Sequence, residues 1–374
     1  MPDAPKRILT ASRSSRLAGR RLIEIPGDML EGGGQIVRTS VALAALTGEA
    51  VRIGKIREKR PNPGLQAQHV TAVKTVAAIC SAETEGLAQG SRELVFRPRE
   101  RVSGKFNFDV GTAGSIPLIL QALMPSAAFA PNRVEFHLTG GTDVKWSPTI
   151  DYVRLVILPV LQLMGYRATV TVHRRGHYPK GGGLVTMAVE PQGALSAITL
   201  VERGTPSTPE GISHCVKLPS HVAQRQANAA RERLSKGGFR DANIAIETYP
   251  PSRDPHFAPG SGIALKVKFP NGAMLGSDSI GERGKPAEHV GEDAADKLLK
   301  ELQSNAPVDR HMGDILIPYV AVAEGRSSIF TSEITMHTLT NMKVAEMVTG
   351  VKFDVQGELG KPGRISVLGI GKKT

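Results

Sequence analysis

Apolar residues recur along most of this chain either with the period of an amphipathic helix or in short β-branched runs. Helical spacing, with apolar residues at i, i+3 and i+4, covers residues 33–46, 65–81, 114–125, 150–164, 312–323 and 337–349. Runs typical of strands lie between them, at residues 51–56, 94–97, 106–110, 134–138, 168–172 and 184–189. The alternation of the two patterns predicts an α/β (α+β) fold in which helices pack on sheets.

The helical stretches fall into three pairs, each with its own strands, which predicts three similar βαβα-type repeats. The pairing is interrupted by an interval with a strand of its own at 262–269 and helices at 221–234 and 289–303. We therefore expect a large discontinuous domain (22–193 and 305–374) and a smaller inserted α/β domain (194–304). One continuous domain is the alternative. Residues 1–21 carry six Lys and Arg among Ser and Ala, which predicts a flexible basic extension.

Composition narrows the classes of function. A net charge of +12 over 374 residues favours phosphate-rich partners such as nucleic acids. Aromatic residues make up only 4%, so a base-stacking platform is not expected. The two cysteines cannot form a disulfide framework and lack the spacing of a metal motif. The apolar runs are too short to span a membrane, and an apolar signal region is missing, so we expect a cytoplasmic protein without a membrane partner.

Four glycine-rich turns each carry or adjoin basic or amide side chains: Glu31-Gly-Gly-Gly-Gln35, Pro61-Asn-Pro-Gly64, Gly111-Thr-Ala-Gly-Ser115 and His177-Tyr-Pro-Lys-Gly-Gly-Gly183. Glycine lets backbone N–H groups approach an anion closely, and a helix N-terminus adds partial positive charge. Each turn alone could be only a tight turn, and none is a Walker loop or a GxGxxG fingerprint. Four of them in one chain favour a phosphate-binding site, and the neighbouring Arg57 and Arg60 could grip phosphate oxygens or lie in a solvated loop.

His337 stands at the start of the last predicted helix. The partial positive charge of a helix N-terminus disfavours imidazolium, so a nitrogen lone pair is available to attack a phosphoryl centre. A lone histidine is more often a packed or surface residue, and His311 is a rival on the residues alone. Asp314 could orient a ligand or a histidine, or it could be a first-turn acid that complements the helix dipole.

Together these residues resemble the RNA 3′-terminal phosphate cyclase family, over about residues 22–353. The resemblance rests on seven motifs in order: Glu31-Gly-Gly-Gly-Gln35, Arg60-Pro-Asn-Pro-Gly-Leu65, Gln68-His69, Gly111-Thr-Ala-Gly-Ser115, Gly140-Gly-Thr-Asp143, His177-Tyr-Pro-Lys-Gly-Gly-Gly183 and His337-Thr-Leu-Thr-Asn341. It implies an enzyme that uses ATP and a divalent metal, Mg²⁺ or Mn²⁺, to adenylylate a histidine. AMP then passes to the 3′-phosphate of RNA, and the vicinal 2′-OH expels AMP to leave a 2′,3′-cyclic phosphate.

The resemblance also implies the roles of individual residues. His337 would be the nucleophile, because it heads the family's last motif and His311 does not. Glu31 would lie near the metal. The nucleotide would contact Gln121, Asp314, Pro148, Tyr178 and His337, and phosphates or RNA would contact Arg38, Arg57, Arg60 and Gln68.

The alternatives are a non-catalytic cyclase-like factor of ribosomal RNA processing, an enolpyruvyl-transferase-like enzyme built from comparable repeats, and a pure RNA-binding module. The residues leave the oligomeric state open, with a dimer as one option.

Overall fold

The computed structural model describes residues 22–374 and has helices at all the positions where the apolar period predicts them. Local signals mark where three of these helices begin: the side chains of Ser115, Thr149 and Thr335 cap their N-termini. The helices are α1 Gly34–Thr47, α2 Ala67–Ile79, α3 Ile116–Ala127, α4 Ile150–Tyr152, α5 Leu158–Gln162, α6 His221–Lys236, α7 Ala287–Gln303, α8 Arg310–Val322 and α9 Met336–Thr349, with a π-helical turn, Val153–Ile157, between α4 and α5 and a 3₁₀ turn, Pro251–Arg253.

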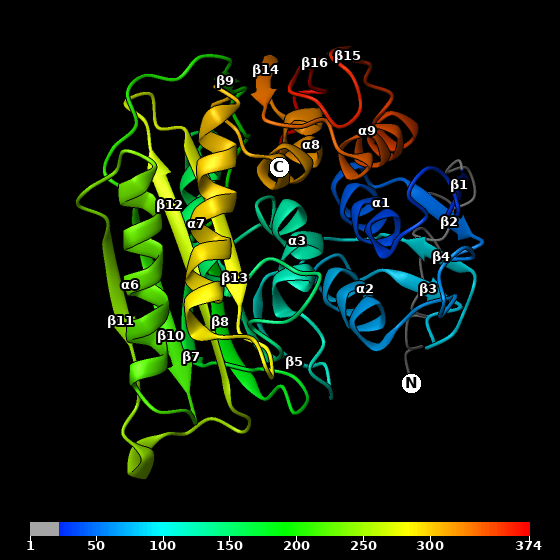
Figure 1. Ribbon diagram of the computed structural model, residues 1–374. Coiled ribbons are helices and arrows are strands. Elements are labelled where there is room, and N and C mark those ends of the chain that lie inside the picture. The colour runs from blue at the N-terminus through cyan, green and yellow to red at the C-terminus, as the bar shows by residue number, and fades with distance from the viewer. Residues whose placement is uncertain (1–21) are drawn as a thin grey trace, which may run out of the picture.

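The strands form four mixed sheets, and the predicted α/β class is confirmed (Figure 1). They are β1 Leu22–Pro26, β2 Ala50–Gly54, β3 Glu83–Glu85, β4 Leu94–Arg97, β5 Gly104–Asp109, β6 Val134–Gly140, β7 Ala168–Arg174, β8 Gly183–Val189, β9 Thr199–Leu200, β10 Glu210–Val216, β11 Asn243–Glu247, β12 Gly260–Lys268, β13 Met274–Ile280, β14 Arg326–Thr331, β15 Phe353–Gln356 and β16 Gly363–Leu368.

Three of the sheets have the same strand order and the same senses of pairing. In β1-β2-β4-β3, the first two strands are parallel and the last two pairings are antiparallel. The sheets β5-β6-β8-β7 and β9-β14-β16-β15 repeat that arrangement. In each, helices lie between the two parallel strands and before the final antiparallel pair, so one supersecondary unit occurs three times.

The fourth sheet, β11-β10-β12-β13, has a different order and two long helices of its own, α6 and α7, which pack against each other and against the sheet. The chain reaches this sheet after β9, a strand that pairs with β14 of the third unit. That pairing favours a start of the insert later than the predicted residue 194. The domain limits stay predictions, and the predicted extension at 1–21 lies outside the described residues.

The three repeated units meet through their helices. Helix α1 contacts α2, α3 and α9, and α8 contacts α9, so these helices bury their apolar faces against one another. Ile36, Leu120, Leu316 and Val344 have no exposed surface, and their burial supplies much of the hydrophobic stabilisation. This packing places the N-termini of α1 and α9, more than three hundred residues apart in the chain, within hydrogen-bonding distance.

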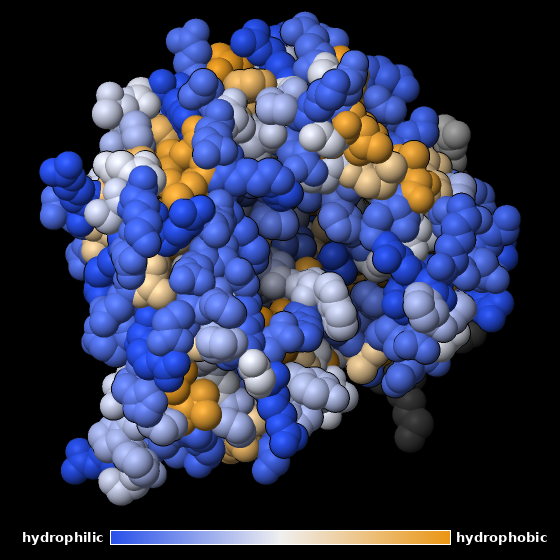
Figure 2. All heavy atoms as spheres, in the orientation of Figure 1, coloured by the Kyte–Doolittle hydropathy of each residue, from blue (hydrophilic) through white to orange (hydrophobic). Residues whose placement is uncertain are grey.

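Within residues 22–374, every helix is too short or too polar to cross a bilayer. Figure 2 shows that the face viewed here is hollowed near its middle and that hydrophilic side chains border the hollow. In the ribbon view α3 lies at that place, between α7 and β13 on one side and α1 and α2 on the other (Figure 1).

Candidate active site

The turn between β1 and α1 carries Glu31 at the N-terminus of a helix without a side-chain cap. Gly33 is the N-cap residue, and it has no side chain to satisfy the first N–H groups of α1. A Cβ on Gly34 would lie 2.0 Å from Nε2 of His69, so only glycine lets that imidazole pack against the start of α1. The glycines of this turn therefore serve close packing as well as open access to the helix N-terminus.

Glu31 lies between His337 and Arg60. Its Oε1 pairs with the guanidinium of Arg60, which also donates to the Glu31 carbonyl at 3.1 Å. Its Oε2 lies 3.1 Å from Nδ1 of His337 but is buried and accepts no hydrogen bond from residues 22–374. A buried carboxylate oxygen without a donor is a suitable ligand for a hard divalent cation. The donor set at Glu31 thus fits the metal that the sequence resemblance implies.

His337 is the second residue of α9, and 48% of its side chain is exposed. Burial of the other half lowers the pKa of His337, Asp314 raises it, and Arg38 and Arg60 lower it further. The net lowering of the pKa favours the neutral imidazole. Its Nδ1 faces Glu31, whereas its Nε2 makes no hydrogen bond within residues 22–374. A neutral, accessible ring nitrogen is what nucleophilic attack requires.

Asp314, on α8, accepts hydrogen bonds from residues at the N-terminus of α9. Its Oδ1 accepts hydrogen bonds from the hydroxyls of Thr335, at 2.6 Å, and Thr338, at 2.5 Å. These two threonines also cap α9 through a reciprocal capping box. Burial raises the pKa of the Asp314 carboxyl, and the two hydroxyls lower it less. Helix α8 begins at Arg310, so Asp314 lies beyond the first turn and the first-turn interpretation is wrong.

A second set of contacts joins α9 to α1 and α8. Asn341 donates to the Asp314 carbonyl at 2.8 Å and accepts from Thr39 at 2.6 Å. Gln35 donates to the carbonyl of His337 at 3.3 Å. Side-chain bonds from two other helices therefore fix the position of the His337 backbone. Sequence reasoning assigned no role to Thr39, Thr335 or Thr338, although a hydroxyl residue before a helix with a polar partner three residues later is a detectable capping signal.

The predicted phosphate-binding residues have different surroundings. Arg38 is half-buried on α1 and makes no hydrogen bond or ion pair within residues 22–374; burial lowers its pKa to about 10, so it stays charged. Arg57 donates to the carbonyls of Asn62 and Gly64 at 2.5 and 3.0 Å and closes its own loop. Gln68 accepts from the backbone N–H of Ser115 at 3.2 Å. Arg38 is the unpaired cation of this set and the one best placed to take an anion.

The other predicted residues lie on the second repeated unit. Gln121 is half-buried on α3, Pro148 is half-buried before α4, and Tyr178 is 78% exposed between β7 and β8. No hydrogen bond or ion pair within residues 22–374 joins any of them to His337. The structure thus brings Glu31 and His337 together with Arg60. The roles of Gln121, Pro148 and Tyr178 stay predictions.

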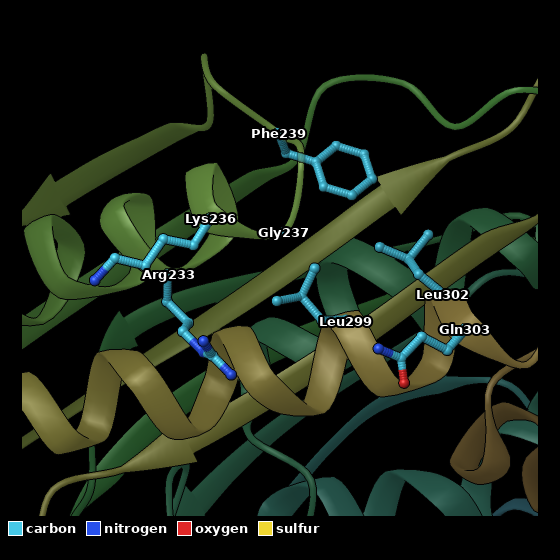
Figure 3. A pocket seen from close by; sticks show the side chains of 7 residues that line it. All are labelled: Arg233, Lys236, Gly237, Phe239, Leu299, Leu302 and Gln303. Carbon is cyan, nitrogen blue, oxygen red and sulfur yellow. The ribbon is translucent and has the colours of Figure 1, made fainter.

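His311, the rival nucleophile, packs edge-on against Tyr152 with ring centroids 6.2 Å apart. Only His337 of the two pairs with Glu31. A pocket of about 330 Å³ lies elsewhere, between the C-terminal ends of α6 and α7, and its lining includes Arg233, Phe239 and Leu299 (Figure 3). None of the predicted site residues lines it.

A family model described as RNA 3′-terminal phosphate cyclase matches residues 29–355. The chain belongs to the RNA 3′-terminal phosphate cyclase family. Similar curated proteins called RNA 3′-terminal phosphate cyclase come from Ignicoccus hospitalis (50% identical over 93% of this chain and 99% of the relative) and Desulfurococcus amylolyticus (50% over 94% and 99%). The relative from Hyperthermus butylicus is also 50% identical, over 93% of this chain and 98% of its own.

The cyclase family is one of ligase-type enzymes, so the resemblance stated from the motifs is confirmed at the level of the family. The names of these relatives match the cyclase proper rather than a cyclase-like processing factor. The individual site residues stay predictions.

Proposed function

We propose that this protein uses ATP to convert the 3′-terminal phosphate of an RNA to a 2′,3′-cyclic phosphate through a histidine–AMP intermediate on His337. The observation that carries the proposal is that Glu31 pairs with both His337 and Arg60 in a member of the cyclase family. A phosphate monoester is a poor electrophile, because its leaving group would be oxide and its charge repels nucleophiles. Attachment of AMP supplies a good leaving group.

In the first step Nε2 of His337 attacks the α-phosphorus of ATP, the P–N bond forms, and the bond to pyrophosphate breaks. Three features support this role: the lowered pKa of His337, the lack of a hydrogen bond on Nε2 within residues 22–374, and its place at a helix N-terminus. That N-terminus and the guanidinium of Arg60 favour the negative charge that develops on the phosphoryl oxygens.

In the second step an oxygen of the RNA 3′-phosphate attacks the phosphorus of the histidine–AMP, and the P–N bond breaks. In the third, the 2′-OH attacks the activated 3′-phosphorus and AMP leaves, which yields the cyclic phosphate. The 2′-OH is already adjacent to its target, so this step gains from proximity. Arg38, unpaired and charged, is proposed to bind phosphate oxygens during these transfers.

The remaining residues take supporting roles. Glu31 would hold a divalent ion, Mg²⁺ or Mn²⁺, which when bound would neutralise charge on the triphosphate. We assign Gln121, Asp314, Pro148 and Tyr178 to the nucleotide, and Arg57, Arg60 and Gln68 to phosphate or RNA. The cytoplasmic location and the oligomeric state stay predictions from the sequence.

The test is covalent labelling with α-³²P-ATP and Mg²⁺ or Mn²⁺, without RNA. Wild type should acquire a label that acid removes and alkali does not, as expected for a phosphoramidate. His337→Ala should not label, whereas the matched control His311→Ala should label like wild type. Labelling of His337→Ala would refute the assignment, and a wild type that never labels would favour the non-catalytic cyclase-like alternative.

A second assay follows the product. An RNA that ends in a 3′-phosphate should become resistant to phosphatase after incubation with enzyme and ATP, whereas an RNA that ends in 3′-OH should not change. Phosphatase sensitivity retained in the presence of labelled enzyme would mean that AMP goes to another acceptor.

A further inference from the structure

Three buried side chains of the types that can bind a metal ion lie close together where the second repeated unit meets the inserted sheet. They are distant from His337 in the sequence. Asp143 follows β6, His177 lies between β7 and β8, and His214 lies on β10. Their exposed fractions are 2%, 5% and 1%. One ligand atom from each lies within 4.8 Å of the other two, and the two imidazole centroids are 5.3 Å apart.

Several buried polar atoms of this cluster lack partners. Oδ1 of Asp143, Nε2 of His177 and both ring nitrogens of His214 make no hydrogen bond within residues 22–374. Buried polar groups are nearly always satisfied, and each one that is not costs free energy. Unsatisfied atoms on all three neighbouring side chains indicate that a bound group satisfies one atom of each.

The strand beside the cluster leaves room for the two imidazoles. Gly262 of β12 pairs across the ladder with His214, and a Cβ on Gly262 would lie 2.9 Å from Cε1 of that ring. A Cβ on Gly260 would lie 2.0 Å from Cγ of His177. Any side chain at these two positions would displace the imidazoles, so both rings depend on glycine here.

Only one oxygen of Asp143 is available to a ligand. Its Oδ2 accepts hydrogen bonds from the hydroxyl of Thr142 at 2.6 Å and from the buried guanidinium of Arg175 at 3.4 Å. Its Oδ1 makes no hydrogen bond within residues 22–374, so this oxygen can bind an ion while the other stays paired.

A third imidazole close to the cluster already has a partner. His256 pairs with its own carboxylate, Asp254, at 2.8 Å, so we do not count it among the ligands.

We propose that Asp143, His177 and His214 bind a divalent first-row transition ion, best matched by Zn²⁺, that ties the inserted domain to the large domain. Two imidazole nitrogens and one carboxylate oxygen suit Zn²⁺, whereas Mg²⁺ prefers oxygen ligands alone. Tetrahedral bonds of about 2.1 Å place neighbouring ligand atoms roughly 3.4 Å apart. The three side chains would therefore move closer by small torsional changes, and a solvent ligand would take the fourth position. This site is separate from the metal predicted at Glu31.

The test measures metal bound to the full-length protein without ATP. Chelator-treated protein is dialysed against Zn²⁺ and then against metal-free buffer, and its metal content is determined by mass spectrometry. One equivalent per chain is expected for wild type, for Glu31→Gln and for His221→Gln, an exposed histidine at the start of α6. His177→Gln and His214→Gln should each lose that equivalent.

Two measurements keep the proposal falsifiable if a variant fails to fold. The melting temperature of wild type should rise with added Zn²⁺, and Co²⁺ in place of Zn²⁺ should give the visible absorption of a four-coordinate nitrogen and oxygen site. Wild type that is folded but retains no metal and shows no Zn²⁺-dependent melting overturns the proposal and leaves water as the partner of these atoms. Loss of the equivalent in Glu31→Gln, with retention in His214→Gln, overturns it in favour of the active site.

Discussion

Replacement of Asp314 should loosen the N-terminus of α9, on which His337 stands. In wild type the carboxylate accepts two short hydrogen bonds, from Thr335 and Thr338, and hydrogen bonds to a charged group contribute about 1.5–3 kcal/mol each. Asp314→Ala removes both. Part of the loss is recovered, because the two hydroxyls already lie 3.0 Å apart and can pair with each other, and because a carboxylate is no longer buried. We expect a net loss of roughly 2–4 kcal/mol in the free energy of unfolding.

Asp314→Asn is the matched control for this loss. Its side-chain oxygen can still accept both hydroxyls, and the cost of burying a charge disappears, so we expect a free energy of unfolding within about 1 kcal/mol of wild type. Urea titrations followed by circular dichroism measure all three proteins at one pH. If the two variants lose the same amount, or if Asp314→Ala loses less than about 1 kcal/mol, the carboxylate does not hold α9 through these bonds.

Three further predictions test other parts of the structure. Gly34→Ala should destabilise the fold by about 1–3 kcal/mol, because its Cβ would meet the His69 ring, whereas Gly54→Ala, with open space around its Cβ, should cost less; equal urea midpoints would contradict this. Burial, with the charge of Glu301 adding to it, raises the pKa of Asp309 from 3.8 to about 6. Because the folded carboxyl stays protonated to a higher pH than the unfolded one, the fold loses stability as pH rises from the unfolded pKa through the folded pKa. Between about pH 4 and 7 the free energy of unfolding of wild type should therefore fall by roughly 2–3 kcal/mol relative to that of Asp309→Asn. Parallel pH profiles would refute this prediction. Arg38→Gln should lower kcat/KM for cyclisation roughly 10- to 150-fold, as expected for one lost charged hydrogen bond to phosphate, without loss of stability; unchanged kcat/KM would exclude Arg38 from the site.

The elements were predictable where the local signal is strong. The helices around Leu43, Leu120 and Val344 and the strands around Ile53 and Val170 lie where the apolar period places them, because these residues bury one face whatever their partners. The sequence analysis named no strand at β1, β3, β9, β10, β11, β13, β14, β15 or β16. Strands β3 and β9 are three and two residues long. They exist as strands through the neighbours that they pair with, so no window of sequence contains their signal.

The candidate site shows the same division. The motifs identified the family and the residues Glu31, Arg60 and His337, because a glycine-rich turn or a histidine at a helix start is a local feature. The motifs did not predict that Glu31 lies between the other two, or that Asp314 supports α9 rather than the first turn of α8. Those facts depend on how α1, α8 and α9 pack.

The sequence by itself determined the α/β class, the places of the main helices and the membership of the cyclase family, since each follows from residues close together in the chain. Only the tertiary structure decided which distant groups meet. His337 and Glu31 come from the third and the first repeated unit, and Asp143, His177 and His214 come from two different sheets. The physical reason is that burial, pairing and pKa depend on distances in space, which the packing of apolar helix and sheet faces sets for the whole chain at once.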